Sequence, residues 1–502
     1  MRSNKIWRAV ILPFLALAVC AAAAISYIAG QNTCMGVKIL SEAEMSRFTA
    51  HTQQEISGHI LLNGDNAAVD AGTFTVYVSQ NIDENTTYKD LKGSLGLSQN
   101  GWQMYFAPDA MFADLALAVQ QGHPFELYID TGNGEYSLYY VVFTTLPVVR
   151  MHGDLYYTNA DSTNVYRGGV TVWESNYAGT GGSMTEKSYT VWQDVDARDM
   201  ADSAASWKLS LRTEQNNVDM LNIAGLGKDD DWLLNSISGD STKIREKLTA
   251  SLWNGMYSFT ERDRMAEGEY VEFIANSEYK GVYTISRRID QKYLDLDIDD
   301  ILLRDKKARR GSYAQNNYTA VHNYYSEQQL WQIVTPFHTM ENCSVIDVNN
   351  WIDANIFTNL VYNNGKRNYT EMYYVWQNAQ YNPQVSMIPV SEDSVFGIKW
   401  NKAKEKYVFD QTISQREVEY RREYTSLKEI YPELDTMIAE RYADLRETSL
   451  SDGAIFSTVD ALQAQLDTSG AYTRTAGDND VEQLKEYIKA RLEYLDLYYN
   501  VK

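Results

Sequence analysis

Cysteine and histidine are scarce in this chain of 502 residues, which contains 3 cysteines and 6 histidines. Three cysteines cannot form the disulfide framework of a small secreted scaffold, so stability must come from packing. We expect Cys34 and Cys343 to stay unpaired, because nothing in the sequence brings them within bonding distance. The histidines lack metal-ligand spacing, which argues against a zinc enzyme. Hydrolases are also disfavoured, because the sequence shows neither a nucleophile elbow nor a persuasive pair of acidic residues.

Dense runs of lysine and arginine are missing outside the N-terminus, and the formal net charge is -22. Such a balance repels polyanions, so we expect no nucleic-acid partner. What the chain does have is 44% hydrophobic residues, with 37 tyrosines and 11 tryptophans. A chain of this length and composition can bury one large core and a second, smaller one, which favours two domains.

The N-terminus carries a targeting signal. Arg2, Lys5 and Arg8 precede an uncharged run at residues 9–29, which is long enough for a hydrocarbon core of roughly 30 Å. Basic residues before the run and acidic sequence after it favour an extracytoplasmic body. The run is either a membrane anchor or the core of a cleaved signal peptide, and we assign residues 1–30 to it.

Residues 57–146 read as a small all-β, sandwich-like module. Short segments rich in valine, tyrosine, phenylalanine and isoleucine alternate there with turn residues such as Asn63-Gly64-Asp65. The predicted strands are His59–Leu62, Thr73–Ser79, Trp102–Phe106, Phe125–Asp130 and Tyr136–Thr144. The module contains no group of residues that suggests chemistry, so a spacer or adhesion role is expected.

Residues 147–502 mix helical and strand patterns, so the fold class is α+β. Apolar residues recur at helical spacing in residues 242–256, 348–362 and 480–499, which predicts three helices whose apolar faces enter a core. Glu269–Ala275 and Lys280–Ile285 are typical of strands, and Asn276-Ser277-Glu278 between them predicts a hairpin.

Four blocks in this region together resemble one protein family. They are Lys228–Asn235 (KDDDWLLN), Asp240–Leu248 (DSTKIREKL), Val271–Asp290 (VEFIANSEYKGVYTISRRID), and the pair Arg441–Arg446 (RYADLR) and Gly470–Arg474 (GAYTR). Their order and spacing are similar to those of the CotH spore-coat kinase-like family. The resemblance implies an atypical protein-kinase-like domain over residues 147–502, with ATP and Mg²⁺ as cofactors. It also implies phosphorylation of serine or threonine on secreted or coat proteins.

The resemblance points to Asn368 and Asp393 as catalytic residues and metal ligands. Members of the family show Asp and then Asn in one segment, and Pro-Trp-Asp-x-Asp-x-x-Phe-Gly in a later one. This chain has Asn363 at the first aspartate and Ser391 at the Pro-Trp-Asp aspartate, whereas Asn368 and Asp393 match. Two or three side chains can hold Mg²⁺, which keeps several waters. An amide at position 363 cannot accept the proton of the attacking hydroxyl.

The nucleotide side is matched by Arg167-Gly168 and by one of two lysines. The family segment Lys-Lys-Ser-Tyr corresponds either to the segment containing Lys187 or to the one containing Lys208, and the second alignment replaces both family lysines with alanine. Glu272, in the predicted hairpin, either orients a cation or is a solvent-facing carboxylate on the strand.

Two functional hypotheses remain. The first is a working extracytoplasmic kinase, in which Arg167 with Lys187 or Lys208 holds phosphates and Asn368 with Asp393 holds Mg²⁺. The second is a pseudokinase that serves as a surface binding or scaffold protein, favoured by the substitutions at Asn363 and Ser391. Both place the protein at the membrane or outside it, on the bacterial cell surface, with a protein as substrate or partner.

Overall fold

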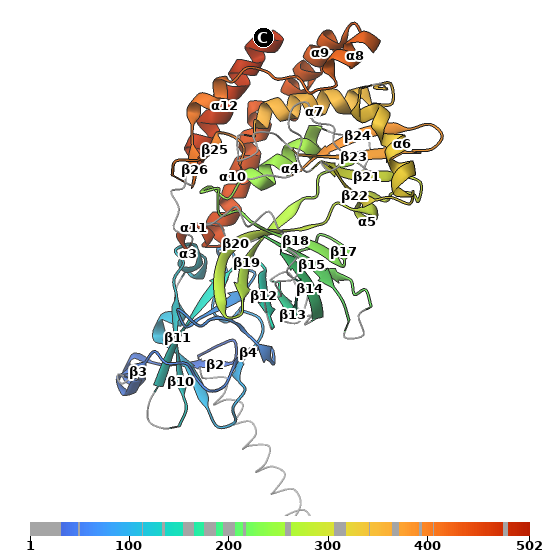
Figure 1. The fold of residues 1–502 in the computed structure, drawn as a ribbon. Coiled ribbons are helices and arrows are strands. Elements are labelled where there is room, and N and C mark those ends of the chain that lie inside the picture. The colour runs from blue at the N-terminus through green and yellow to red at the C-terminus, as the bar shows by residue number, and fades with distance from the viewer. Residues whose placement is uncertain are drawn as a thin grey trace, which may run out of the picture.

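Three bodies of secondary structure follow one another along the chain in the computed structural model (Figure 1). An N-terminal sheet region lies at one end, a β-barrel in the middle, and a mixed region rich in helices at the other end. Mixed helices and sheets confirm the predicted α+β class. The structure describes residues 32–48, 51–112, 114–132, 136–153, 165–174, 187–193, 206–213, 217–256, 263–305, 318–340, 342–363, 371–390, 394–404, 406–474 and 480–501.

The N-terminal region is built from one large sheet and one small sheet that share a core. The large sheet runs β1 (Thr33–Cys34), β2 (Val37–Ile39), β9 (Gln103–Phe106), β10 (Phe125–Asp130), β11 (Tyr136–Thr144), β7 (Thr75–Ser79), β6 (Ala68–Asp70), with β3 (His51–Thr52) beside β11. The small sheet runs β5 (Asp65–Asn66), β4 (Ile60–Leu62), β8 (Leu95–Leu97). The short helices are α2 (Glu42–Met45), η1 (Ser46–Phe48), η2 (Pro108–Met111) and α3 (Leu115–Gln120).

The five predicted strands of this region are present, and the sheet also includes residues before position 57. Strand β2 pairs in parallel with β9, so residues before 57 belong to the sheet. At the other end, Val148, Trp173 and Ile274 of the barrel enter the same buried cluster as the sheet residues. The sequence could not show the β2–β9 pairing or the shared core, because both bring distant segments together.

Seven strands close the barrel. Their order is β12 (Val148–His152), β13 (Val165–Trp173), β14 (Lys187–Gln193), β15 (Trp207–Leu211), β18 (Asp231–Ser236), β20 (Glu278–Arg287), β19 (Gly268–Ala275). The parallel pairing of β12 with β19 completes the circle. The predicted hairpin is β19–β20, and its turn residues Asn276 and Ser277 have φ angles of 47° and 61°, as tight hairpin turns require. A small ladder of β16 (Leu221–Asn222) and β17 (Lys228–Asp229) lies beside the barrel strands.

The third region packs helices against a four-stranded sheet of β22 (Tyr318–His322), β21 (Ile301–Asp305), β23 (Met372–Gln377) and β24 (Gln384–Pro389). Its helices include α4 (Arg245–Met256), α5 (Gln291–Leu294), α6 (Glu327–His338), α7 (Val348–Val361) and α8 (Tyr424–Ile430). The remainder are η6 (Gln411–Gln415), α9 (Leu434–Glu447), α10 (Asp452–Thr468), α11 (Ala471–Arg474) and α12 (Val481–Tyr499), with the hairpin β25 (Ile398–Asn401)–β26 (Lys406–Phe409). The largest buried cluster of the chain lies here.

The three predicted helices of this region correspond to α4, α7 and α12. Helix α4 begins three residues later than predicted, at Arg245, because Asp240 Oδ2 accepts the backbone N–H of Arg245 at 2.9 Å. Lys243, with a φ angle of 59°, lies outside the helix. The apolar face predicted for α12 is buried as expected, including Leu484, Ile488 and Leu495.

Two of the sequence predictions concern export and disulfides. Cys34 and Cys343 are buried and free, which confirms that they are unpaired. Among the described residues, no helix combines the length and apolar character needed to cross a membrane. The predicted apolar run at residues 9–29 lies outside the described residues.

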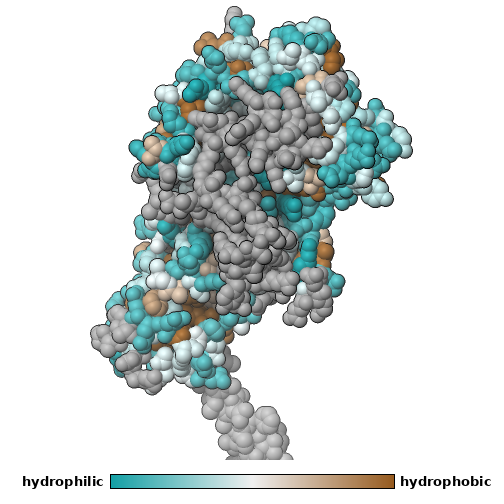
Figure 2. Space-filling model, in the orientation of Figure 1, coloured by the Kyte–Doolittle hydropathy of each residue, from teal (hydrophilic) through white to brown (hydrophobic). Residues whose placement is uncertain are grey.

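The described surface in Figure 2 is mostly hydrophilic with small, scattered hydrophobic patches, which agrees with the excess of acidic residues.

Helix α11 joins the C-terminal helices to the N-terminal region, and Gly470 permits the contact. Gly470 has a φ angle of +71°, and a Cβ atom there would lie 2.1 Å from the carbonyl oxygen of Val119. Thr473 Oγ1 donates to the carbonyl oxygen of Gln120 at 2.9 Å. Helices α3 and α11 are therefore in direct contact (Figure 1).

We predict that Gly470→Ala lowers the free energy of unfolding by at least about 1 kcal/mol, since an alanine is strained at this φ and its Cβ clashes with the backbone. Chemical denaturation of the full chain followed by circular dichroism measures this. Gly453→Ala in α10 is the matched control, because a Cβ there meets nothing within 4 Å. Equal stability of the two variants would contradict the close contact of α11 with α3.

Candidate nucleotide and metal site

The two lysines considered for phosphate binding lie on neighbouring strands but at different levels of the barrel. Lys208 of β15 pairs with Trp192 of β14, whereas Lys187 opens β14 and pairs with Val170. Positions 187 and 192 are five residues apart, which corresponds to about 17 Å of strand. One phosphate site therefore does not take equivalent contributions from both lysines.

Lys208 points away from the barrel interior. Its neighbours Leu209 and Leu211 enter the barrel core, and successive side chains of a strand alternate between faces. Arg167 lies on β13 and pairs with Thr190 of β14. The side chains of Arg167 and Lys187 are outside the described part of the structure.

Glycines 168 and 169 explain part of the Arg-Gly motif by packing alone. A Cβ at Gly168 would lie 2.2 Å from the carbonyl oxygen of His152, and one at Gly169 would lie 2.4 Å from the His152 ring. Only residues without a side chain allow β13 to approach the end of β12 this closely.

Sequence reasoning missed one buried carboxylate, that of Glu246. It lies against the outer face of the barrel, the face on which Lys208 also lies. Glu246 of α4 accepts hydrogen bonds from Thr284 Oγ1 at 2.7 Å and from Asn235 Nδ2 at 3.2 Å. Burial raises the pKa of Glu246, and these two bonds oppose the rise. Leu233 pairs with Lys208 and lies two residues from Asn235. The side chains of Lys208, Leu233 and Asn235 therefore share the outer face of the barrel. The family-like block Asp240–Leu248 contains Glu246, so this block is the sequence signal that could have identified it.

Glu272 is fully buried, so the solvent-facing alternative is wrong. One carboxylate oxygen accepts from Tyr279 OH at 2.6 Å, and the other accepts from Thr144 Oγ1 at 3.0 Å. The carboxylate also forms an ion pair with Arg474, which donates in addition to the Ser469 carbonyl oxygen at 2.9 Å. The cation that Glu272 orients within the described residues is therefore Arg474, from α11.

Asn368 and Asp393 both lie outside the described residues, but the chain on either side of them is described. The backbone N–H of Val390 donates to the carbonyl oxygen of Glu371 at 2.9 Å, which extends the β23–β24 ladder by one step. Asn368 is three residues before Glu371, and Asp393 is three residues after Val390. The two segments therefore join the sheet at neighbouring positions of one edge.

Two buried carboxylates, Asp305 and Glu371, lie at this edge of the four-stranded sheet. Asp305, at the end of β21, pairs with Tyr318 at the start of β22, and it is only 3% exposed. Glu371 is 5% exposed and accepts from Arg304 Nη2 at 3.0 Å. Asn363, where the family has aspartate, follows α7 and is 7% exposed. Burial of polar groups is expensive unless each is paired.

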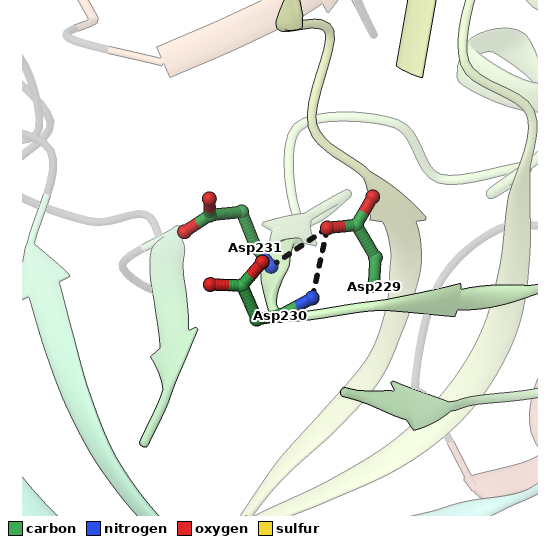
Figure 3. A group of neighbouring side chains, drawn as sticks. All are labelled: Asp229, Asp230 and Asp231. Carbon is green, nitrogen blue, oxygen red and sulfur yellow. Dashed lines mark hydrogen bonds between the residues drawn. The ribbon is translucent and has the colours of Figure 1, made fainter. Parts of the chain in front are cut away.

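A second group of acidic residues follows β17, where Asp229, Asp230 and Asp231 lie together (Figure 3). Their ligand oxygens are within 4.8 Å of one another. Asp229 Oδ1 also accepts the backbone N–H groups of Asp230 and Asp231 at 2.8 and 3.1 Å. Geometrically, this group could hold a cation.

The side-chain ammonium group of Lys292 already lies among these three aspartates. Lys292 Nζ contacts all three carboxylates, at 2.9 Å from Asp229 and 3.0 Å from Asp231. Arg287 pairs with Asp229, and Arg212 pairs with Asp230. A metal ion would have to displace Lys292, so the group serves as an internally neutralised ion-pair network.

The chain is an α+β protein with a closed barrel. A buried glutamate of α4 lies against the outside of this barrel, and buried polar side chains lie at one edge of the four-stranded sheet. A family model described as CotH kinase protein matches residues 198–495. The chain belongs to this family of kinase-like proteins, as its sequence motifs predicted. A comparison with curated proteins finds no match. The family match begins within the barrel, after strands β12 to β14.

We predict that Glu272→Gln destabilises the full chain by about 3–5 kcal/mol, because Arg474 is left buried without its counter-charge. Chemical denaturation measures the change. The control is Glu278→Gln in the same hairpin, where an exposed carboxylate pairs with Lys280. We expect the control to cost less than about 1 kcal/mol. A similar small loss in both variants would disprove the importance of the Glu272–Arg474 ion pair.

The aspartate group also predicts a pH effect. Burial raises the pKa of Asp229, but Lys292, the backbone N–H of Asp231 and Arg287 outweigh it, so the pKa is lowered overall. An acid with a lowered folded pKa adds stability above its unfolded pKa of about 3.9, and this stability is lost as the pH falls through the folded pKa. Lys292→Met should therefore destabilise the protein at neutral pH and progressively less as the pH falls below about 4.

Unfolding curves of both proteins across this pH range provide the measurement. Lys485→Met, which removes a lysine paired with the exposed Asp460, is the control and should show a small difference from wild type. A stability gap for Lys292→Met that does not change with pH would show that Lys292 does not set the pKa of Asp229.

Proposed function

We propose that this protein is an extracytoplasmic kinase that transfers the γ-phosphoryl group of ATP, with Mg²⁺, to serine or threonine of secreted or surface proteins, coat proteins included. The observation that carries the proposal is the hydrogen bond between Val390 and Glu371. This bond brings the segments of Asn368 and Asp393 to one sheet edge in a chain of the CotH family. Phosphoryl transfer needs positioned metal ligands more than it needs covalent chemistry from the protein.

Support on the nucleotide side favours Lys208 over Lys187. Kinases use a strand lysine for the phosphates, and a helix glutamate pairs with that lysine. Lys208 shares the outer barrel face with Asn235, which binds Glu246 of α4. In this proposal Lys208 holds the phosphates, Glu246 orients it and Arg167 contributes from β13. Glu272 contributes by holding Arg474 and the barrel wall, without contact to the nucleotide.

The alternative is a pseudokinase that binds partners without transferring phosphate. Asn363 favours this alternative, because it is a buried amide at the position where the family has the proton-accepting aspartate. A general base typically contributes about 10²–10⁴-fold to a rate. Nucleotide binding with Mg²⁺ is expected under the first proposal and is not required under the alternative.

The proposals on location and partners rest on the sequence alone. We propose that residues 9–29 anchor the chain in a membrane or direct its export, and that the body acts outside the cytoplasm on a protein partner. The acidic net charge argues against nucleic acid as that partner.

We predict that the full chain, purified in mild detergent, binds ATP only when Mg²⁺ is present, as measured by calorimetry. We also predict that Asp393→Asn abolishes this Mg²⁺-dependent binding. Asp460→Asn is the matched control, because Asp460 is an exposed carboxylate of α10. We expect Lys208→Met to weaken ATP binding at saturating Mg²⁺, whereas Lys187→Met leaves it unchanged.

The outcomes separate the hypotheses. Metal-dependent binding that Asp393→Asn removes justifies a search for phosphorylated surface proteins with labelled ATP. Absence of ATP binding with and without Mg²⁺ would overturn the kinase proposal and leave the scaffold. A loss caused by Lys187→Met instead of Lys208→Met would reverse the choice of lysine.

A further inference from the structure

The turn that leads into α4, residues 240–244, is closed by buried side chains. Asp240 Oδ1 accepts the backbone N–H of Thr242 at 3.0 Å and the Thr242 hydroxyl group at 2.8 Å. Arg245 forms a buried ion pair with the same carboxylate, and its backbone N–H donates to Asp240 Oδ2. Lys243 bends the chain within this turn with a φ angle of 59°. The entry turn and the start of α4 therefore form one connected unit.

Two tyrosines from different regions hold the carbonyl groups of this entry turn. Tyr270 OH, from β19 of the barrel, donates to the carbonyl oxygen of Lys243 at 2.8 Å. Tyr472 OH, from α11, donates to the carbonyl oxygen of Thr242. Both tyrosine side chains are buried, and a hydrogen bond lost at a buried position leaves an unsatisfied polar group at a cost. The entry turn is thus held between the barrel and α11.

Helix α11 is itself fixed by the N-terminal region on both sides of Tyr472. Gly470 lies against the backbone of α3, and Thr473 Oγ1 donates to a carbonyl oxygen of the same helix. Arg474 Nη2 donates to Thr144 Oγ1 of β11 at 3.3 Å. Because α11 has only four residues, neither of its ends can shift without moving Tyr472. The position of the Tyr472 hydroxyl group therefore depends on how the N-terminal region is docked.

Glu246 lies in the first turn of α4, directly after the entry turn. Its carboxylate accepts hydrogen bonds from Thr284 and Asn235 at the outer barrel face, on which Lys208 also lies. Thr242, whose carbonyl group Tyr472 holds, precedes Glu246 by four residues. A shift of the entry turn therefore changes the place of the carboxylate relative to the barrel lysine. A misplacement of about 1 Å at a reacting site can cost about 10²-fold in rate.

We propose that Tyr472 is a positioning residue for Glu246, and that through Tyr472 the docking of the N-terminal region sets the nucleotide side of the site. This inference rests on the proposed function, in which Glu246 orients Lys208. Tyr472 itself touches neither nucleotide nor metal in this account. The N-terminal region then acts as a regulatory element. A protein partner that tightens the contact of α3 with α11 favours ATP binding, and ATP binding favours that contact in turn.

A double-mutant cycle in the full chain tests this relay without any nucleotide. Gly470→Ala disturbs the contact with α3, and Tyr472→Phe removes only the hydroxyl group. The readout is hydrogen–deuterium exchange of the Arg245 and Leu248 amides, which are bonded to the entry turn. Tyr472→Phe should speed this exchange roughly two- to twelvefold relative to the amides of α9, as loss of one buried hydrogen bond predicts. Gly470→Ala should speed it as well.

The second substitution separates a relay from general loosening. Added to Tyr472→Phe, Gly470→Ala should have no further effect on these amides. Added to the matched control Tyr270→Phe, which removes the other carbonyl bond of the entry turn, Gly470→Ala should keep its full effect. Equal effects in both backgrounds, or no effect in the wild-type chain, would overturn the proposal. If Gly470→Ala does not fold, Thr473→Val, which removes the hydroxyl group that binds α3, replaces it in the cycle.

Calorimetry of ATP binding at saturating Mg²⁺ tests the role of Tyr472 in the site. Tyr472→Phe should weaken binding by a similar factor. Tyr442→Phe, which removes a buried hydroxyl group of α9 that donates to Asp496 at 2.8 Å, is the matched control and should leave binding unchanged. Unchanged affinity of Tyr472→Phe, in a chain that binds ATP, would overturn the positioning role. If the wild-type chain does not bind ATP, the proposed function fails and the positioning role with it, while the exchange cycle still decides whether α11 couples the N-terminal region to α4.

Discussion

The buried ion pair between Glu272 and Arg474 is the contact on which the arrangement of the three regions depends. Glu272 comes from the barrel, Arg474 from the C-terminal helices, and Thr144, which hydrogen-bonds to both, from the last strand of the N-terminal sheet. Removing two charges from water is costly unless further hydrogen bonds satisfy them. Tyr279 and Ser469 provide those bonds here. The N-terminal region is thereby docked on the barrel and the C-terminal helices.

Many of the residues that carry the family resemblance are explained by architecture. Arg441 binds Asp353 of α7 with two nitrogens, and Arg446 binds Asp496 of α12. Asp240 and Arg245, both buried, form the ion pair at the start of α4. Such residues specify how helices meet, and a pseudokinase needs them as much as an active enzyme does. Membership of the family therefore establishes the architecture more firmly than it establishes catalysis.

Local patterns in the sequence were sufficient for the elements but not for their partners. The hairpin turn at Asn276-Ser277 and the apolar face of α12 could be predicted because each depends on neighbouring residues. Closure of the barrel by β12 and β19 could not, because it pairs segments more than a hundred residues apart. The partner of Glu272 lies 202 residues away, so the sequence offered a solvent-facing carboxylate as an equal alternative. Glu246 was overlooked because a carboxylate in an amphipathic helix normally faces water.

Under the kinase proposal, the asparagine at position 363 has a limited energetic meaning. Holding reactants in the right geometry can supply about 7–11 kcal/mol of a barrier, whereas a general base typically contributes about 10²–10⁴-fold, or roughly 3–5 kcal/mol. The described residues include two energetically costly features. Phe396 has a φ angle of 49° although it is not glycine, which costs about 1–2 kcal/mol. Arg491 is buried without a carboxylate partner among the described residues. Under the kinase proposal, geometry would supply more of the barrier reduction than the base does, so an asparagine at position 363 is compatible with a slow enzyme and does not by itself imply that phosphoryl transfer is abandoned.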